Sequence, residues 1–165
     1  MHWQTPQIPT LHRGRVAAEE REIGEATITF TMKIAINACF GVFNLSAKAI
    51  SRIAEMNGQK AYFFNTASSG KDRHLIPVPI EEAGLFTIAY NTPTPSYPDV
   101  DSEILSHRYD CRHDDKLIKA IEELGSEANG PCSKIKIVEI PDGVEYEIEE
   151  YDGMESIQEK HRSWR

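Results

Sequence analysis

Two arginines close together in an acidic chain are the first candidates for binding chemistry. Arg108 and Arg112 flank a Tyr-Asp-Cys segment, and the chain carries a formal net charge of −8. A guanidinium group donates paired hydrogen bonds that match the oxygens of a phosphate. The two side chains could instead pair with carboxylates close in sequence, namely Asp110, Asp114 or Asp115. The spacing therefore predicts either a phosphate-binding pair or an internal ion-pair network.

A glycine-containing loop is the second candidate. The segment Phe40-Gly41-Val42-Phe43 lies between an isoleucine-rich run and a segment with the pattern of a helix. Backbone amides and the helix dipole at such a junction favour an anion. The loop has neither the lysine of a P-loop nor the GxGxxG spacing of a dinucleotide site. It is therefore either an anion-binding turn or a tight turn that places both aromatic rings in the core.

Other polar and aromatic side chains could contribute to a site. Tyr90 and Asn91 follow one another at the end of a predicted strand, where they could stack on and hydrogen-bond a base, or simply end the strand. Three basic residues could form a patch, or balance the glutamates of the C-terminal part: Lys134, Lys136 and Arg162.

Cysteine and histidine residues offer a weaker case for metal binding or nucleophilic catalysis. The residues in question are His107, Cys111, His113 and Cys132. Zinc accepts these side chains, but the spacing is not that of a standard zinc finger and no CxxC motif is present. A cysteine nucleophile needs a base, which His107 or His113 could supply to Cys111. We expect no metal, no cofactor and no catalytic residue, and keep catalysis through these residues as an alternative.

The first half of the chain predicts a strand–loop–helix–strand unit. Residues 33–38 form an isoleucine-rich strand, and Ser46 is a good N-cap for a helix that ends at Gly58. Residues 61–65 predict the second strand. Apolar residues spaced three and four apart give the helix one buried face.

The middle of the chain predicts less regular structure. Residues 66–74 are polar and predict a loop, and residues 75–80 contain two prolines and predict at best an edge strand. Residues 85–90 predict a third strand, followed by a proline-containing loop at 91–102. Asp114 can cap a second helix with an apolar face, which ends at Gly125 or at Asn129-Gly130.

The C-terminal part predicts a β-hairpin. Residues 135–140 are rich in β-branched side chains, and residues 144–149 alternate apolar side chains with glutamates. A turn at 141–143, Pro-Asp-Gly, would pair these two runs with each other. Residues 154–165 predict a last helical turn. The class is therefore α+β, with a small, mostly antiparallel sheet, a C-terminal hairpin and two main helices.

Length, charge and cysteine content narrow the class of protein. We expect residues 1–31 to be a loose or appended segment and residues 32–165 to form a single domain. The negative charge argues against binding DNA or RNA polymers. No apolar run of the 165 residues is long enough to cross a bilayer. Three irregularly spaced cysteines do not form a disulfide framework, which favours a reducing cytoplasm.

From residue 33 onward the sequence resembles a family of small phage and prophage proteins. The likeness is weakest from residue 66 to residue 106, and residues 1–31 lie outside it. The segments that carry it are residues 33–46, 112–115, 123–125, 128–130, 136–153 and 159–164.

This family is similar to the phage anti-Thoeris sponges. These proteins sequester cyclic ADP-ribose isomers made by bacterial TIR-domain proteins, bind them without cleavage, and assemble as oligomers with ligand sites between subunits. The resemblance implies that Phe86 and Asn91 contact the nucleotide and that Arg108 and Arg112 contact its pyrophosphate. The chain departs from the family pattern at three positions, where the family has glycine, proline and tryptophan: Val42, Lys116 and Tyr146.

The expected function is therefore that of a sponge for a cyclic nucleotide. It would act as a homo-oligomer in the cytoplasm of an infected bacterial host, without contacting a membrane. The expected ligand-binding residues are Phe40, Gly41, Phe43, Phe86, Asn91, Arg108, Arg112, Lys136 and Arg162. Two alternatives remain: a nucleotide hydrolase that uses His107, Cys111 or His113, and an inhibitor that binds a host protein through its acidic hairpin.

Overall fold

The computed structural model describes residues 22–23, 26–27, 30–69, 72–98, 103–104 and 111–160. The chain divides into two units, Met1–Phe30 and Thr31–Arg165. In the first unit, the short strands β1 (Glu22–Ile23) and β2 (Ala26–Thr27) pair antiparallel. Everything described below belongs to the second unit.

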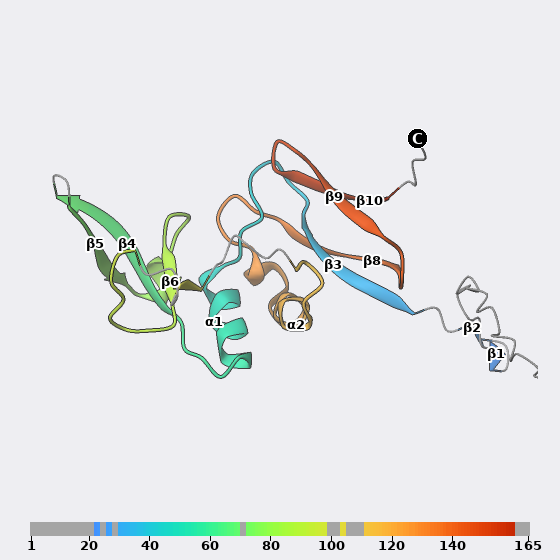
Figure 1. Cartoon of the computed structure of the whole chain (residues 1–165), viewed down its shortest axis with the longest axis horizontal. Helices are drawn as coiled ribbons and strands as arrows, with labels where there is room; N and C mark the ends of the chain where they lie inside the picture. Colours follow the sequence, from blue (N-terminus) through green and yellow to red (C-terminus); the bar gives the residue numbers. More distant parts are fainter. Residues whose placement is uncertain are drawn as a thin grey trace, which may run out of the picture. The chain divides into compact units, whose positions relative to one another are not determined.

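The second unit combines two α-helices with small antiparallel sheets, which confirms the predicted α+β class (Figure 1). The helices are α1 (Ala47–Met56) and α2 (Asp115–Leu124), and two short 3₁₀ helices are η1 (Ile80–Glu82) and η2 (Gly125–Ala128). The strands are β3 (Thr31–Asn37), β4 (Tyr62–Ser69), β5 (Asp72–Val78), β6 (Ile88–Tyr90), β7 (Glu103–Ile104), β8 (Ile135–Pro141), β9 (Tyr146–Tyr151) and β10 (Met154–Glu159). Within the described residues, no helix is both long enough and apolar enough to span a bilayer.

Both helices begin and end as their sequences predict. The Ser46 hydroxyl accepts a hydrogen bond from the Ala49 amide at 3.2 Å, and Gly58 follows the end of α1 with φ +69°. The Asp114 carboxylate accepts hydrogen bonds from the first turn of α2, and Gly125 ends that helix with φ +55°. These local signals fix the helix bounds because each depends only on residues one turn apart.

The apolar faces of α1 and α2 form the centre of the core. Side chains from β3, β4 and β6 complete it. On the surface, α1 forms two ion pairs: Arg52 with Glu123 of α2 at 2.7 Å, and Lys48 with Glu127 of η2 at 2.6 Å. The buried residues of the cluster are Ala35, Phe43, Leu45, Ala49, Ile50, Ile53, Phe63, Ala89, Leu117, Ile118, Ala120, Ile121 and Ala128.

The strand partners at the C-terminus differ from the prediction. β8 pairs antiparallel with β3, with Ile34 opposite Val138, so the predicted pairing of residues 135–140 with 144–149 is wrong. β3 is the better partner because it is equally long and rich in isoleucine, and its side chains from Ile34 to Ile36 are buried. A strand that buries one face takes the register that keeps that face in the core.

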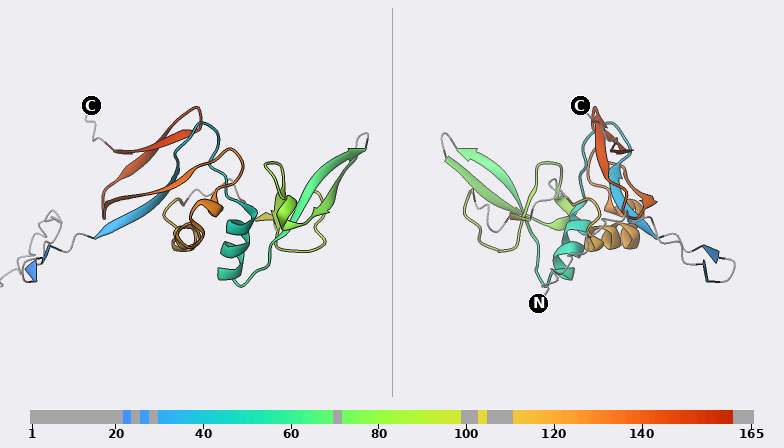
Figure 2. Two further views of the ribbon diagram at one scale, coloured as in Figure 1. Left: turned by 180° about the vertical axis from the view of Figure 1, so that it is seen from behind. Right: turned by 45° about the vertical axis from the view of Figure 1, so that its right-hand side comes forward.

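A C-terminal hairpin is nevertheless present, one strand later than predicted. β9 pairs with β10 through a turn at Asp152 and Gly153, both with positive φ, so the predicted helical turn from residue 154 is wrong. An Asp-Gly pair with two positive φ angles matches the twist of a two-residue hairpin. Figure 2 shows this hairpin beside β3, and Figure 1 shows its turn close to the loop that follows β3.

The remaining strands form one sheet in the order β5–β4–β6–β7. The predicted loop at 66–74 is wrong, because β4 extends to Ser69 and pairs with β5 from Asp72 onward. β5 is an edge strand, as the two prolines of residues 75–80 predict, and one of them, Pro77, lies in the strand. β6 begins at Ile88, later than the predicted strand, and leaves residues 83–87 as a loop on the surface.

Candidate functional site

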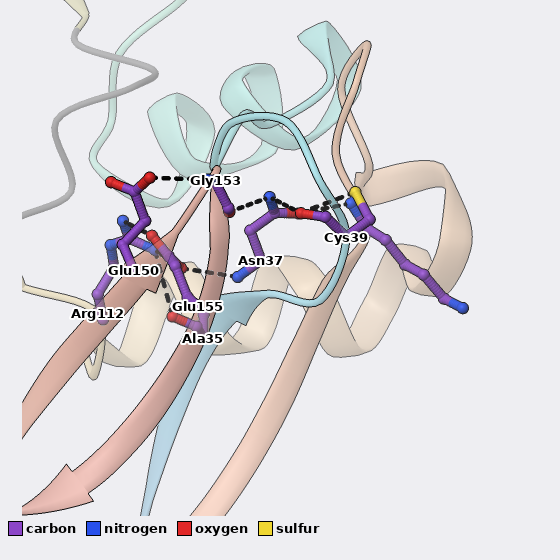
Figure 3. Close-up of polar contacts among 8 residues, drawn as sticks. Ala35, Asn37, Cys39, Arg112, Glu150, Gly153 and Glu155 are labelled. Carbon is purple, nitrogen blue, oxygen red and sulfur yellow. Dashed lines mark hydrogen bonds and ion pairs between the residues drawn. The ribbon is translucent and has the colours of Figure 1, made fainter.

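Asn37 is a buried amide at the end of β3 that joins three segments of the chain (Figure 3). Its Nδ2 donates to the carbonyl oxygens of Cys39 at 2.9 Å and Gly153 at 2.7 Å. Its Oδ1 accepts the Lys134 amide at 2.9 Å. The side chain therefore holds together the glycine loop, the turn of the β9–β10 hairpin and the start of β8.

Arg112 forms an internal ion pair with Glu155. Its Nη1 and Nη2 donate to the two carboxylate oxygens at 3.0 and 2.9 Å, and the two side chains are 15% and 9% exposed. The guanidinium carbon lies 3.5 Å from the centre of the Phe43 ring. Glu155 also accepts a hydrogen bond from the backbone N–H of Asn37 at 2.7 Å. Of the two interpretations of Arg112, the geometry favours an ion pair, with a partner distant in sequence.

The glycine loop is packed tightly against the hairpin turn. The Gly41 amide donates to the Asp152 carbonyl and the Val42 amide to the Cys132 carbonyl, both at 3.2 Å. A Cβ at Gly41 would lie 2.1 Å from the Cys132 oxygen. These two amides serve the fold rather than an anion, and the close backbone contact explains the glycine. Phe43 is in the core as the tight-turn interpretation predicts.

A groove beside an exposed phenylalanine is the best candidate for a ligand site. Phe86 is 86% exposed and lies on a groove of about 570 Å³. The Thr87 hydroxyl donates to the Asn65 side-chain oxygen at 2.8 Å and accepts the Gly84 amide at 2.8 Å, so the polar groups are fixed in place. We call this the Phe86 groove; its lining residues are Asn65, Thr66, Glu82, Gly84, Leu85, Phe86 and Thr87.

The other residues predicted to bind ligand do not gather in one place. Asn91 is exposed directly after β6, and Lys136 is exposed on β8 opposite Ile36. Phe40 is 63% exposed, so only one of the two loop aromatics is in the core. Arg112 is not among the described residues that line the Phe86 groove.

Arg108 and Arg162 lie outside the described residues. Tyr90 is buried and packs edge to face with Phe64, with ring centres 5.6 Å apart, so it does not present a face on which a base could stack.

Cys111, His113 and Tyr146 form a chain of polar contacts. The Cys111 sulfur lies 3.5 Å from His113 Nε2, and His113 Nδ1 lies 2.9 Å from the Tyr146 hydroxyl. Burial raises the pKa of Tyr146, the Cys111 sulfur adds to this rise, and the Arg112 charge opposes it. Among the described residues, no group of three or more metal-binding side chains comes together. His107 lies outside the described residues.

A second groove, of about 440 Å³, contains a cation and an aromatic ring that the sequence analysis did not select. The Lys60 ammonium lies 5.1 Å from the centre of the Tyr62 ring. Residues of α1, β4 and β5, together with Ile80 and Pro93, complete its walls.

The sequence analysis did not select two residues that connect β3, Arg112 and the β9–β10 hairpin: Asn37 and Glu155. An asparagine at the end of an otherwise apolar strand was the available signal for the first, because such a side chain needs hydrogen-bond partners when it is buried. Glu155 had no local signal, because its role depends on a hairpin that was expected elsewhere.

Comparison of the chain with protein-family models, with curated proteins and with solved structures found no significant match.

Proposed function

We propose that this protein binds a small cyclic nucleotide of the cyclic ADP-ribose class and sequesters it without cleaving it. The observation that carries the proposal is the exposed Phe86 ring beside a groove with fixed amide and hydroxyl groups. The resemblance of the sequence to the phage sponges supplies the class of ligand. In this proposal the protein acts in the cytoplasm of an infected bacterial host.

The Phe86 groove suits the base and the ribose of such a ligand. A base stacked on Phe86 would gain about 1–3 kcal/mol. Asn65, Thr66 and Thr87 offer hydrogen bonds to the edge of the base or to ribose hydroxyls. Glu82 can accept from a ribose hydroxyl but repels a phosphate. The pyrophosphate would therefore lie away from the groove.

Arg112 could bind the pyrophosphate of the ligand only by exchanging its ion pair with Glu155. A phosphate would have to compete with Glu155, which already accepts two hydrogen bonds from the guanidinium group. Because Arg112 does not line the Phe86 groove, we assign the two regions to different subunits of a homo-oligomer. This assignment agrees with the intersubunit sites that the resemblance implies.

Replacement of Phe86 tests the proposal directly. We expect Phe86→Ala to weaken binding of a cyclic ADP-ribose isomer by about tenfold or more, because each 1.4 kcal/mol of lost stacking corresponds to a factor of ten. Tyr151→Ala is the matched control, since Tyr151 is also a strongly exposed aromatic residue but does not line the groove. Titration calorimetry measures both affinities, and equal affinities for Phe86→Ala and the unchanged protein would remove Phe86 from the site.

The fate of the ligand separates the proposal from its alternatives. After binding and heat denaturation, a sponge returns the intact ligand, whereas a nucleotide hydrolase leaves product that mass spectrometry detects. Native mass spectrometry of the protein after incubation with the nucleotide separates the third possibility, because an inhibitor that binds only host proteins gains no small-molecule mass. The same spectrum gives the number of subunits.

A further inference from the structure

We propose that Cys111 is a site of thiol–disulfide exchange, at which His113 takes the thiol proton and Tyr146 orients the imidazole. The site would react with small-molecule disulfides. It is independent of the nucleotide proposal, since none of the three residues lines the Phe86 groove.

The three side chains have the arrangement that activates a nucleophile. Nucleophile and base lie within reach of each other at 3.5 Å, and the base is held by a third group at 2.9 Å. The rings of His113 and Tyr146 lie edge to face at 82°, and the contact at 2.9 Å places the Nδ1 edge of the imidazole at the hydroxyl. A chance contact of cysteine and histidine would not require this third partner.

The backbone around Cys111 and His113 is fixed on both sides. The Arg112 carbonyl accepts the Ala35 amide of β3 at 2.9 Å, and the Asp114 amide donates to the Cys111 carbonyl at 3.2 Å. Asp114 in turn caps α2. The thiol and the imidazole are therefore held on a segment that is hydrogen-bonded to β3 and leads into α2, while Cys111 itself remains exposed to reagents.

In the proposed site, Tyr146 accepts a hydrogen bond from the imidazole and holds it in an orientation in which it can act as a base. When Nδ1 carries the proton, it donates to the Tyr146 oxygen, and the lone pair of Nε2 faces the thiol. The raised pKa of Tyr146 agrees with a neutral hydroxyl, whose oxygen can accept this hydrogen bond. Tyr146 is thus a positioning residue that acts through His113.

The proposed step is a balanced exchange. His113 Nε2 takes the Cys111 proton, and the sulfur attacks one sulfur of a disulfide RSSR. A new S–S bond joins Cys111 to that sulfur, and the S–S bond of the reagent breaks. The leaving thiolate takes the proton from the imidazolium and departs as RSH. The Cys111 sulfur is oxidised and the released thiol is the reduced product.

The other two cysteines are internal references. Cys132 is exposed, but among the described residues its thiol makes no hydrogen bond with a histidine. The Cys39 thiol is partly exposed and donates to the Asn37 side-chain oxygen at 3.3 Å. Only Cys111 combines exposure with a neighbouring base among the described side chains.

The test measures how fast each cysteine forms a mixed disulfide. The full chain is incubated with 2-hydroxyethyl disulfide, a neutral reagent that the acidic protein does not repel, and peptide mass spectrometry follows each site. We expect Cys111 to react about tenfold or more faster than Cys132 in the same molecule. His113→Asn and His113→Gln should slow Cys111 by a similar factor and leave Cys132 unchanged.

The outcomes are decisive in both directions. Equal rates at Cys111 and Cys132, or unchanged reaction of Cys111 in both His113 variants, would overturn the proposal. A variant that unfolds would raise the rate at the partly exposed Cys39, so loss of the fold is recognised in the same experiment. For Tyr146→Phe we expect slower reaction of Cys111 together with a changed tautomer of His113, detected by nitrogen NMR of the imidazole. An unchanged tautomer would remove Tyr146 from the site.

Discussion

Arg112 has its guanidinium group committed to the interior of the protein. Glu155 accepts two of its hydrogen bonds, and Phe43 covers one face of the group. Such a pair offsets the desolvation of both charges, and removal of one partner leaves the other charge buried and unpaired. The residue that the sequence marks for phosphate binding is therefore also a structural residue.

Arg112→Ala should lower the free energy of unfolding by about 3 kcal/mol, because Glu155 would lose its partner. Lys136→Ala is the control, since this exposed lysine should change stability by less than about 0.5 kcal/mol. Denaturant unfolding gives both values. If the two variants were equally stable, the ion pair would contribute little to the fold.

The close contact of two glycines gives a second residue-scale prediction. A Cβ at Gly153 would lie 1.5 Å from the Gly41 oxygen, and Gly153 has φ +82°. Gly143 has a similar φ of +77° but open space around it. We expect Gly143→Ala to cost about 1–2 kcal/mol from the positive φ alone, and Gly153→Ala to cost clearly more. Equal midpoints in denaturant unfolding would contradict the tight packing of hairpin turn and glycine loop.

At the scale of elements, the helices are joined by their core faces and by surface ion pairs. Lys48 pairs with Glu127 and Arg52 pairs with Glu123. The hydrogen bond from Arg52 is the main cause that lowers the pKa of Glu123, and that from Lys48 is the main cause that lowers the pKa of Glu127. These pairs are exposed, so their contribution is small and sensitive to salt.

The sign of the pH dependence follows from the lowered pKa values. A carboxyl group whose pKa is lower in the folded protein stabilises the folded state at pH values above its ordinary pKa of 4.5. This stabilisation is lost as the pH falls through the lowered pKa. The melting temperature should therefore fall less on acidification in the double variant Glu123→Gln, Glu127→Gln than in the unchanged protein. The difference should shrink at high salt, and a parallel pH dependence of both proteins would exclude these two groups.

Strand pairing is the feature of the elements that local patterns predicted least well. The alternation of residues 144–149 correctly indicated a strand, β9, but its partner is β10 rather than β8. A Pro-Asp-Gly turn and an Asp-Gly turn both lie in this region, and sequence distance favoured the first. The apolar strand β3 pairs with β8 instead, although it lies more than ninety residues earlier, as the separation of Asn37 and Lys134 illustrates.

At the scale of the whole molecule, the core cluster lies entirely within the second unit. Its first member is Ala35, and its last is Ala128. The β9–β10 hairpin adds no residue to this cluster but carries Glu155 and Gly153, through which it is fastened to β3 and to the glycine loop.

Two truncations should therefore differ in their effect on the melting temperature. Removal of residues 1–30 should leave the melting temperature nearly unchanged, because every residue of the core cluster remains. Removal of residues 154–165 should lower it by several degrees, because β9 loses its partner strand and Arg112 loses Glu155. Calorimetry of both proteins checks the expectation, and a large loss in the first would show that the first unit stabilises the second.

The sequence by itself determined the α+β class, the strand β3 and both α-helices with their caps. These features depend on periodicity and on hydrogen bonds between residues at most one turn apart, which a linear sequence displays directly. It also marked Arg112 and Cys111 as residues capable of chemistry, and the resemblance to the phage proteins added Phe86.

Only the tertiary structure decided what those residues contact. Glu155 reaches Arg112 and Tyr146 reaches His113 across separations of 43 and 33 residues, once the hairpin has folded beside β3. The partners of a strand and of a buried charge are chosen by competition among distant segments for burial and hydrogen bonds, and no local pattern encodes the result of that competition.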